Sequence, residues 1–180
     1  MPTQLQTLTQ IDFDSLIARG GFTPSPFAWE DQAFYFLMLD RFSDGKEIGY
    51  KDEQGNVVNT GTTPIFTLAN AGNAVQNSAD AARWREAGVK YVGGNLLGLK
   101  SKIGYLKRLG ITALWISPIF KQVRFQETYH GYGIQNFLEV EPHFGTKEDL
   151  QAVVKAAHAE GIYVILDIIL NHSGNVFSYQ

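Results

Sequence analysis

The residues best suited to chemistry in this sequence lie at the end of its most apolar run. Asp167 interrupts the run 162–170, and Asn171 and His172 come directly after it. A carboxylate among apolar side chains requires an ion pair or hydrogen bonds to offset its loss of water. If the run is a strand of an α/β barrel, Asp167 and Asn171 share one face, at the carboxyl end where barrels bind ligands and metals. A hydrogen-bonded strand carboxylate followed by an ordinary loop histidine accounts for the same residues equally well.

A second candidate group is the segment 129–133, which reads Tyr-His-Gly-Tyr-Gly. Tyr132 offers a flat apolar face and His130 a ring that can donate or accept a hydrogen bond, and a sugar ring needs both kinds of contact. Aromatic residues beside glycine more often only pack a loop, so the pattern by itself is weak. Its position after a predicted strand favours a binding role.

These groups can meet only if the strands before them are neighbours, and two segments have the pattern of a helix followed by a buried strand. The first consists of an apolar stripe, a glycine and a β-branched run: Leu96, Leu99, Ile103, Leu106, Gly110 and 111–117. The second adds a capping box before the same features: Thr146, Asp149, Leu150, Val153, Val154, Ala157, Gly161 and 162–170. Alternating helices and fully apolar strands predict an α/β fold with a parallel sheet.

A third apolar run, 33–39, predicts an earlier strand that ends at Asp40 and Arg41. These two could lie with the other polar groups at the carboxyl end of the barrel, although a structural ion pair is the commoner explanation. More than fifty residues rich in Gly, Asn and Thr separate this strand from the helix near Asn95, which predicts a long, elaborated loop with a short helix over 80–86.

Composition narrows the range of partners. The chain has 180 residues, of which 44% are hydrophobic, enough for a globular core, and its net charge of −3 provides no positive field for phosphate backbones or anionic lipid. We therefore expect no nucleic acid and no membrane as partners. The first ten residues carry no basic group ahead of an apolar run, so we expect no signal peptide and favour the cytoplasm.

Taken in chain order, four segments resemble the alpha-amylase family over residues 33–177: FYFLMLDRFSDG, GGNLLGLKSKIGYLKRLGITALWISPIF, YHGYGIQNFLEVEPHFGTKEDL and GIYVILDIILNHSG. The last contains the family's Asp-x-x-x-Asn-His pattern as Asp167, Asn171 and His172. The sequence departs from the commoner pattern at Asn136, where many relatives carry an aspartate, and this leaves substrate preference open.

The resemblance implies a role for each candidate residue. Tyr132 would stack on the sugar at the point of cleavage, His172 would hydrogen-bond that sugar, and Asp167 would hold the hydrogen-bond network, with His130 beside them in the substrate site. Asn171 would correspond to a calcium ligand in those members that bind the ion. Calcium is the one cofactor that the resemblance suggests, and its other ligands would lie after Gln180.

The resemblance also implies the fold: an incomplete TIM (β/α)8 barrel made of its first three βα units, with the long loop after the first strand. We expect residues 1–32 to form an N-terminal extension and 33–180 the first part of the catalytic barrel, as a truncated piece. A retaining glycosidase needs two catalytic carboxyl groups. By resemblance both the nucleophile and the acid/base follow Gln180, so we expect no catalytic residue in this chain.

The predicted parent is a retaining glycoside hydrolase or transglycosylase acting on α-glucosidic bonds of starch-like glucans or oligosaccharides, and this chain alone is expected to be inactive. An open sheet edge and an uncovered apolar face would favour self-association. One alternative is a non-catalytic sugar-binding or scaffold protein with an amylase-like core. A doubly wound nucleotide binder is disfavoured because no Gly-x-Gly-x-x-Gly or phosphate-loop motif follows any predicted strand.

Overall fold

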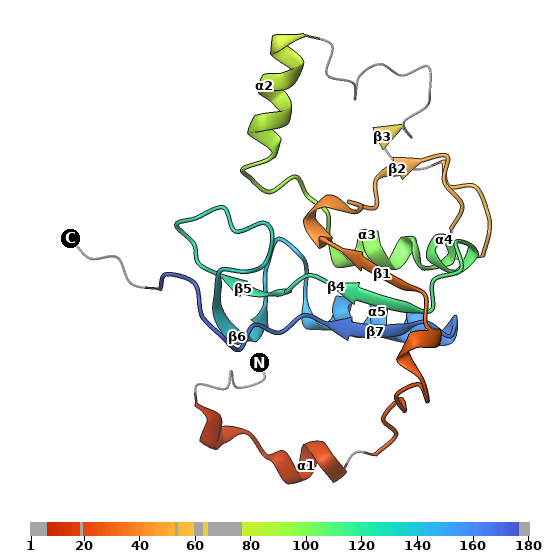
Figure 1. Cartoon of the computed structure of the whole chain (residues 1–180), viewed down its shortest axis with the longest axis vertical. Coiled ribbons are helices and arrows are strands. Elements are labelled where there is room, and N and C mark those ends of the chain that lie inside the picture. Colours follow the sequence, from red (N-terminus) through yellow and green to blue (C-terminus); the bar gives the residue numbers. More distant parts are fainter. Residues whose placement is uncertain (1–6, 19, 53, 60–62, 65–76, 177–180) are drawn as a thin grey trace. The chain divides into compact units, whose positions relative to one another are not determined.

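The computed structural model describes residues 7–18, 20–52, 54–59, 63–64 and 77–176, and divides into two compact units, Met1–Asp31 and Gln32–Gln180 (Figure 1). The first unit contains the 3-10 helix η1 (Leu8–Gln10), the helix α1 (Phe13–Ala18) and the 3-10 helix η2 (Trp29–Asp31). Across the described residues, no helix has the length and apolar character that a membrane crossing requires.

The second unit is built on a parallel sheet of three strands in the order β1-β4-β7 (Figure 1). These strands are β1 (Phe34–Leu37), β4 (Ala113–Ile116) and β7 (Tyr163–Leu166). Phe36 is paired with Trp115 and Trp115 with Ile165, so the strands run in register. The predicted α/β arrangement with a parallel sheet is confirmed.

The strand β7 is shorter than the apolar run that predicted it. It ends at Leu166, so Asp167 lies just beyond the strand rather than inside it, contrary to the sequence prediction. Its neighbour β4 ends at Ile116, and the last ladder bond joins Asp167 N to the carbonyl of Ile116 at 3.2 Å. Pro118 follows two residues later and has no N–H to extend the pairing.

Three helices cover one face of this sheet: α3 (Leu96–Ser101), α4 (Ile103–Arg108) and α5 (Lys147–Ala159) (Figure 1). The core between them and the sheet includes Leu37, Leu96, Leu99, Ile103, Leu106, Leu114, Ile116, Val153 and Ala157. The capping box of Thr146 and Asp149 begins α5 as predicted, because each residue bonds the backbone N–H of the other.

The first predicted helix is in fact two, because the backbone leaves helical geometry at Lys102, with φ −106° and ψ 3°. At the last residue of α3, the hydroxyl of Ser101 donates to the carbonyl of Gly98 at 2.7 Å. The apolar spacing nevertheless holds across the break, since all four residues of the stripe are buried.

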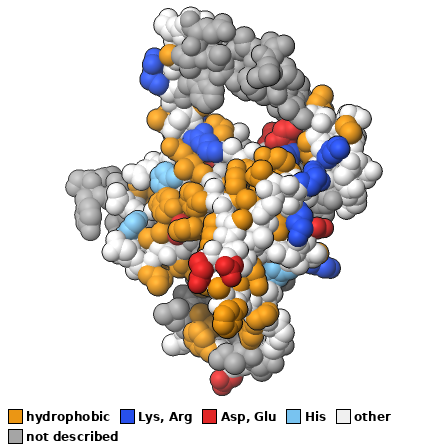
Figure 2. All heavy atoms as spheres, turned by 45° about the vertical axis from the view of Figure 1, so that its right-hand side comes forward, with side chains coloured by type: hydrophobic (Ala, Val, Ile, Leu, Met, Phe, Trp, Pro, Cys, Tyr) orange, Lys and Arg blue, Asp and Glu red, His pale blue; other side chains and the backbone are white. Residues whose placement is uncertain are grey.

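Aromatic side chains remain exposed on the opposite face of the sheet. Phe34, Phe36 and Trp115 are 47%, 49% and 41% exposed, and the rings of Phe36 and Trp115 meet edge to face at 5.3 Å. Hydrophobic side chains are widespread on the side of the molecule shown in Figure 2. The described part of the chain therefore buries only one face of its central sheet.

Other elements flank the sheet. A short parallel pair joins β2 (Glu47–Ile48) and β3 (Thr63–Pro64), and α2 (Ser78–Ala87) contains the short helix that was predicted over 80–86. An antiparallel pair, β5 (Phe120–Gln122) and β6 (Ile134–Val140), was not predicted. Its register shifts twice within β5, so it lacks the regular alternation that marks a strand in sequence.

The chain after β1 packs directly on the start of α3. Gly94 N donates to Asp40 O at 2.8 Å, and Asn95 N donates to Ser43 O at 2.9 Å. A Cβ atom on Gly98 would collide with the carbonyl oxygen of Ser43, and one on Gly94 with that of Leu39. Only residues without a side chain allow this approach.

We predict that Gly98→Ala lowers the free energy of unfolding by about 1–3 kcal/mol, because the added methyl group has no room. Helix propensity alone would give the opposite sign, since alanine is favoured over glycine by about 1 kcal/mol within a helix. Urea denaturation checks the sign. Leu97→Ala, a change at a neighbouring side chain that is 59% exposed, serves as the control and should shift stability by less than about 0.5 kcal/mol.

Candidate functional site

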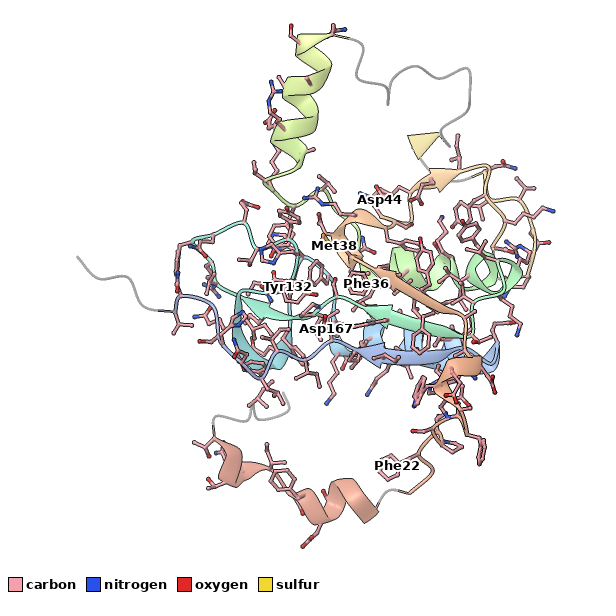
Figure 3. All side chains as sticks on the ribbon, viewed as in Figure 1. Phe22, Phe36, Met38, Asp44, Tyr132 and Asp167 are labelled. Carbon is pink, nitrogen blue, oxygen red and sulfur yellow. The ribbon has the colours of Figure 1, made fainter. Side chains whose placement is uncertain are left out.

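Two residues far apart in sequence meet at the carboxyl end of the parallel sheet. Tyr132 lies in the loop between β5 and β6, and Asp167 directly follows β7. The phenolic Oη of Tyr132 donates a hydrogen bond to Oδ2 of Asp167 at 2.8 Å, and the two side chains point toward each other beyond β4 and β7 (Figure 3). This bond supplies the partner that a carboxylate at the end of an apolar strand requires.

Both candidate histidines contact the backbone of the same tyrosine. Tyr132 N donates to Nδ1 of His130 at 3.0 Å, and Nε2 of His172 lies 3.3 Å from the carbonyl oxygen of Tyr132. A carbonyl only accepts, so Nε2 of His172 carries the proton in this contact, and its Nδ1 accepts from the amide of Asn171 at 3.3 Å. The structure thus brings His130, Tyr132, Asp167 and His172 into one cluster, hereafter the Tyr132 cluster.

Burial and charge set the protonation of the Tyr132 cluster. Burial, with the hydrogen bond to Asp167 and its charge, raises the pKa of Tyr132 to about 12. Burial lowers the pKa of His130 below its ordinary value, and its Nδ1 is bonded in the unprotonated form. Near neutral pH the cluster therefore presents a protonated phenol and a neutral imidazole.

The faces of the aromatic rings add an apolar surface. The rings of His130 and Tyr132 are stacked, with centroids 5.8 Å apart and planes 25° apart, and both side chains are partly exposed. The neighbouring Tyr129 meets the edge of His130 at 5.3 Å. The cluster therefore combines a stacking surface with hydrogen-bonding groups, the two properties that sugar binding requires.

Close backbone contacts fix the loop that carries Tyr132. Gly131 has φ +89°, and a Cβ there would collide with the carbonyl oxygen of Pro118. Gly174, just after His172, donates from its N–H to Ile134 O at 2.7 Å, and a Cβ there would lie 2.6 Å from the oxygen of Gly133. Glycines on both segments thus allow the loop and the chain after β7 to touch.

The described residues do not form a calcium site around Asn171. Its side chain is exposed and its amide nitrogen is bonded to His172, and within the described ranges no three His, Cys, Asp or Glu residues gather as a metal-binding group. Calcium takes six to eight oxygen ligands. One amide oxygen does not meet that requirement, so no step is assigned to the ion.

Asp40 and Arg41 have the structural role that the sequence analysis favoured. Asp40 is 2% exposed and accepts from Val92 N at 3.0 Å and Gly93 N at 3.1 Å. Arg41 lies 3.5 Å from the Asp40 carboxylate, donates to Ala87 O at 2.7 Å and Lys90 O at 3.0 Å, and sits 3.9 Å above the ring of Tyr129. The pair ties the end of β1 to the segment before α3.

Gln122 is a neighbour of the Tyr132 cluster that sequence analysis did not single out. It lies at the end of β5, is 2% exposed, and its side chain bonds the backbone on both sides of Tyr132. A glutamine in this position is common in sequences and does not by itself indicate a contact. Its partners, Gly131 and Gly133, come only after the irregular loop that follows β5, so no short spacing in the sequence predicts the pairing.

Residues 36–180 match the family model described as alpha amylase, catalytic domain. Alpha-amylase 2 of Dictyoglomus thermophilum is 48% identical over 149 residues, which are 82% of this chain and 20% of that relative. The alpha-amylase of Geobacillus thermoleovorans complexed with acarbose has a TM-score of 0.54 at 34% identity, covering 83% of this chain and 25% of that one. The cyclomaltodextrin glucanotransferase CldA has a TM-score of 0.52 at 34% identity, covering 79% and 26%. The chain spans 10% to 20% of the length of curated relatives that it matches.

We predict that Tyr132 remains protonated at about pH 11, where an ordinary tyrosine with a pKa of about 10 is ionised. The tyrosinate absorbance of the wild-type chain and of Tyr132→Phe should therefore coincide up to that pH and separate above it. Asp167→Asn removes the negative charge and should lower the pKa of Tyr132 toward the ordinary value, with burial keeping it higher. Circular dichroism checks that the chain stays folded, and an early titration of Tyr132 would contradict the geometry.

Proposed function

Since the chain belongs to the alpha-amylase family, we propose that it supplies part of the glucan-binding site of a retaining glycoside hydrolase or transglycosylase. The observation that carries the proposal is the bond from Tyr132 to Asp167, which joins two of the family's motifs at the carboxyl end of the parallel sheet. Barrel enzymes place their active sites at that end.

Each member of the Tyr132 cluster has a role in this proposal. The face of Tyr132 stacks on a glucosyl ring, and its hydroxyl stays protonated and bonded to Asp167. His172 and His130 flank the same residue. Sugar hydroxyls would bond to these rings, and at His172 they would share or replace the contacts with Tyr132 O and Asn171. The names of the relatives support starch-like substrates, and one of the solved structures is complexed with acarbose.

Cleavage itself requires more carboxyl groups than the cluster contains. Retaining glycosidases use two, about 5–5.5 Å apart, as nucleophile and acid/base. Among the described residues bonded within the cluster, Asp167 carries a carboxyl group, and its Oδ2 is occupied by Tyr132. We assign Asp167 to positioning, and we place the nucleophile and acid/base after Gln180, as the family resemblance implies.

The test is hydrolysis of a chromogenic α-maltooligosaccharide by this chain and by a polypeptide extended through the whole barrel. We expect activity only in the longer form, and a loss in kcat/KM on the order of 100-fold for Tyr132→Ala in it, because sugar positioning is removed. Tyr105→Ala, at a tyrosine of α4 that is 47% exposed, is the matched control and should leave the rate unchanged.

Each outcome of this assay has a distinct meaning. Activity of the short chain alone would contradict the placement of the catalytic carboxyl groups. If neither polypeptide hydrolyses the oligosaccharide but both still bind it, the non-catalytic sugar-binding alternative is favoured.

We also propose that the 180-residue chain associates with itself through its uncovered sheet. Among the described strands, β1 and β7 each pair on one side only, and the face of Phe36 and Trp115 is exposed. Sedimentation velocity at rising concentration should show oligomers, and Phe36→Lys should shift them toward monomer. Leu97→Lys, which changes an exposed leucine on α3, should not. A concentration-independent monomer would contradict the proposal.

A further inference from the structure

The side chain of Gln122 bonds the polypeptide on both sides of Tyr132. Its Nε2 donates to Gly131 O at 2.9 Å and to Phe120 O at 2.7 Å, and its Oε1 accepts from Gly133 N at 2.8 Å. Because Tyr132 lies between the two bonded glycines, the amide spans the residue whose hydroxyl donates to Asp167.

Only one orientation of this amide satisfies all of its neighbours. Turning it over would place its oxygen against two carbonyl oxygens and its NH2 group against an N–H. The side chain is 2% exposed, so water cannot replace these partners, and an unsatisfied buried polar group is costly. The amide therefore fixes the backbone at residues 131 and 133 in one geometry.

The backbone of Gln122 is itself fixed by a hydrogen bond to Glu141. Its backbone N–H donates to Oε2 of Glu141 at 2.8 Å, and the other carboxylate oxygen of Glu141 lies 2.5 Å from Nδ1 of His143. Glu141 is 5% exposed, and the His143 ring stacks on Tyr91 at 3.9 Å. The contact between Gln122 and Glu141 is buried, whereas His143 at the outer end is exposed. The buried bond to Glu141 fixes the backbone of Gln122, which limits its freedom to follow a displaced loop.

We propose that Gln122 is a positioning residue for the glucan site, which holds Tyr132 in place through Gly131 and Gly133. The inference rests on the proposed function for its sugar-binding consequence, whereas its geometric consequence stands independently of any sugar. The sequence gives no indication of this role. The side chain of Gln122 bonds only backbone groups, so it would act on the site through the loop backbone and not through contact with the sugar.

The first test replaces the amide by an apolar side chain of similar length, Gln122→Met, in the full 180-residue chain. Carbon-13 labelling of the eight tyrosines allows each ring to be followed by NMR, and Tyr132→Phe assigns the signal of Tyr132. In Gln122→Met we expect that signal to move and broaden while the circular dichroism is unchanged. Gln135→Met, at an exposed glutamine of β6, is the matched control and should leave Tyr132 undisturbed.

A second variant, Gln122→Glu, keeps the test decisive if the methionine variant fails to fold. A protonated carboxyl group can donate to one carbonyl and accept from Gly133 N, whereas a carboxylate would repel the carbonyl oxygens of Gly131 and Phe120. Burial raises the pKa of the introduced group above the ordinary value of about 4.3. His130 accepts from Tyr132 N only when its Nδ1 is unprotonated, so the wild type is followed over the same pH range as the reference. The Tyr132 signal of the variant should match that of the wild type at acid pH and depart from it at neutral pH.

The results separate the two proposals. A Tyr132 signal that stays native in a folded Gln122→Met, or that follows the wild type at every pH in Gln122→Glu, would overturn the positioning role. In the wild type, added maltoheptaose should shift the Tyr132 signal, and Gln122→Met should weaken that binding by about tenfold. If Tyr132 moves in both variants but no wild-type signal responds to maltoheptaose, Gln122 positions the loop and the proposed sugar site is wrong.

Discussion

The pairing of β4 between β1 and β7 is the constraint on which the rest of this structure depends. It sets the ends of three strands level, since Leu37, Ile116 and Leu166 are partners in the register. Ser117, 1% exposed, continues the contact by donating from its N–H to Leu37 O at 2.9 Å, while its hydroxyl accepts from Leu39 N at 3.1 Å. The segments that follow the three strands therefore all begin at the same end of the sheet, the carboxyl end. This common starting point allows polar residues that are distant in sequence to meet.

Packing on the two faces of the sheet is unequal. Helices α3, α4 and α5 bury one face with residues that are almost fully excluded from water, and this supplies the hydrophobic free energy of the unit. The other face keeps its aromatic rings partly exposed. In a parallel sheet, which is normally covered on both sides, such a face is available to further polypeptide.

The polar groups at the strand ends follow a different principle from the core. Asp40 is bonded to backbone N–H groups, Glu141 to two backbone N–H groups and a histidine ring, and Asp167 to a phenol. Each carboxylate has a specific donor, because an unpaired charge in that environment would be expelled or neutralised. The buried carboxylates and Gln122 thus shape the loops, while Tyr132 and the two histidines remain partly open to a ligand.

The sequence alone determined the features that depend on neighbours within a few residues. The capping box before α5, the apolar stripes, the glycines after the helices and the apolar strands all follow from short-range periodicity, and the Asp167, Asn171 and His172 pattern identified the family. Tertiary structure decided where β7 ends, because its pairing stops with β4, and where the first predicted helix is interrupted, at Lys102. It also decided the β5 and β6 pair, the bond between Tyr132 and Asp167, and the clamp by Gln122. These contacts join residues across loops of irregular conformation, and no spacing along the chain encodes which backbone group will face which side chain.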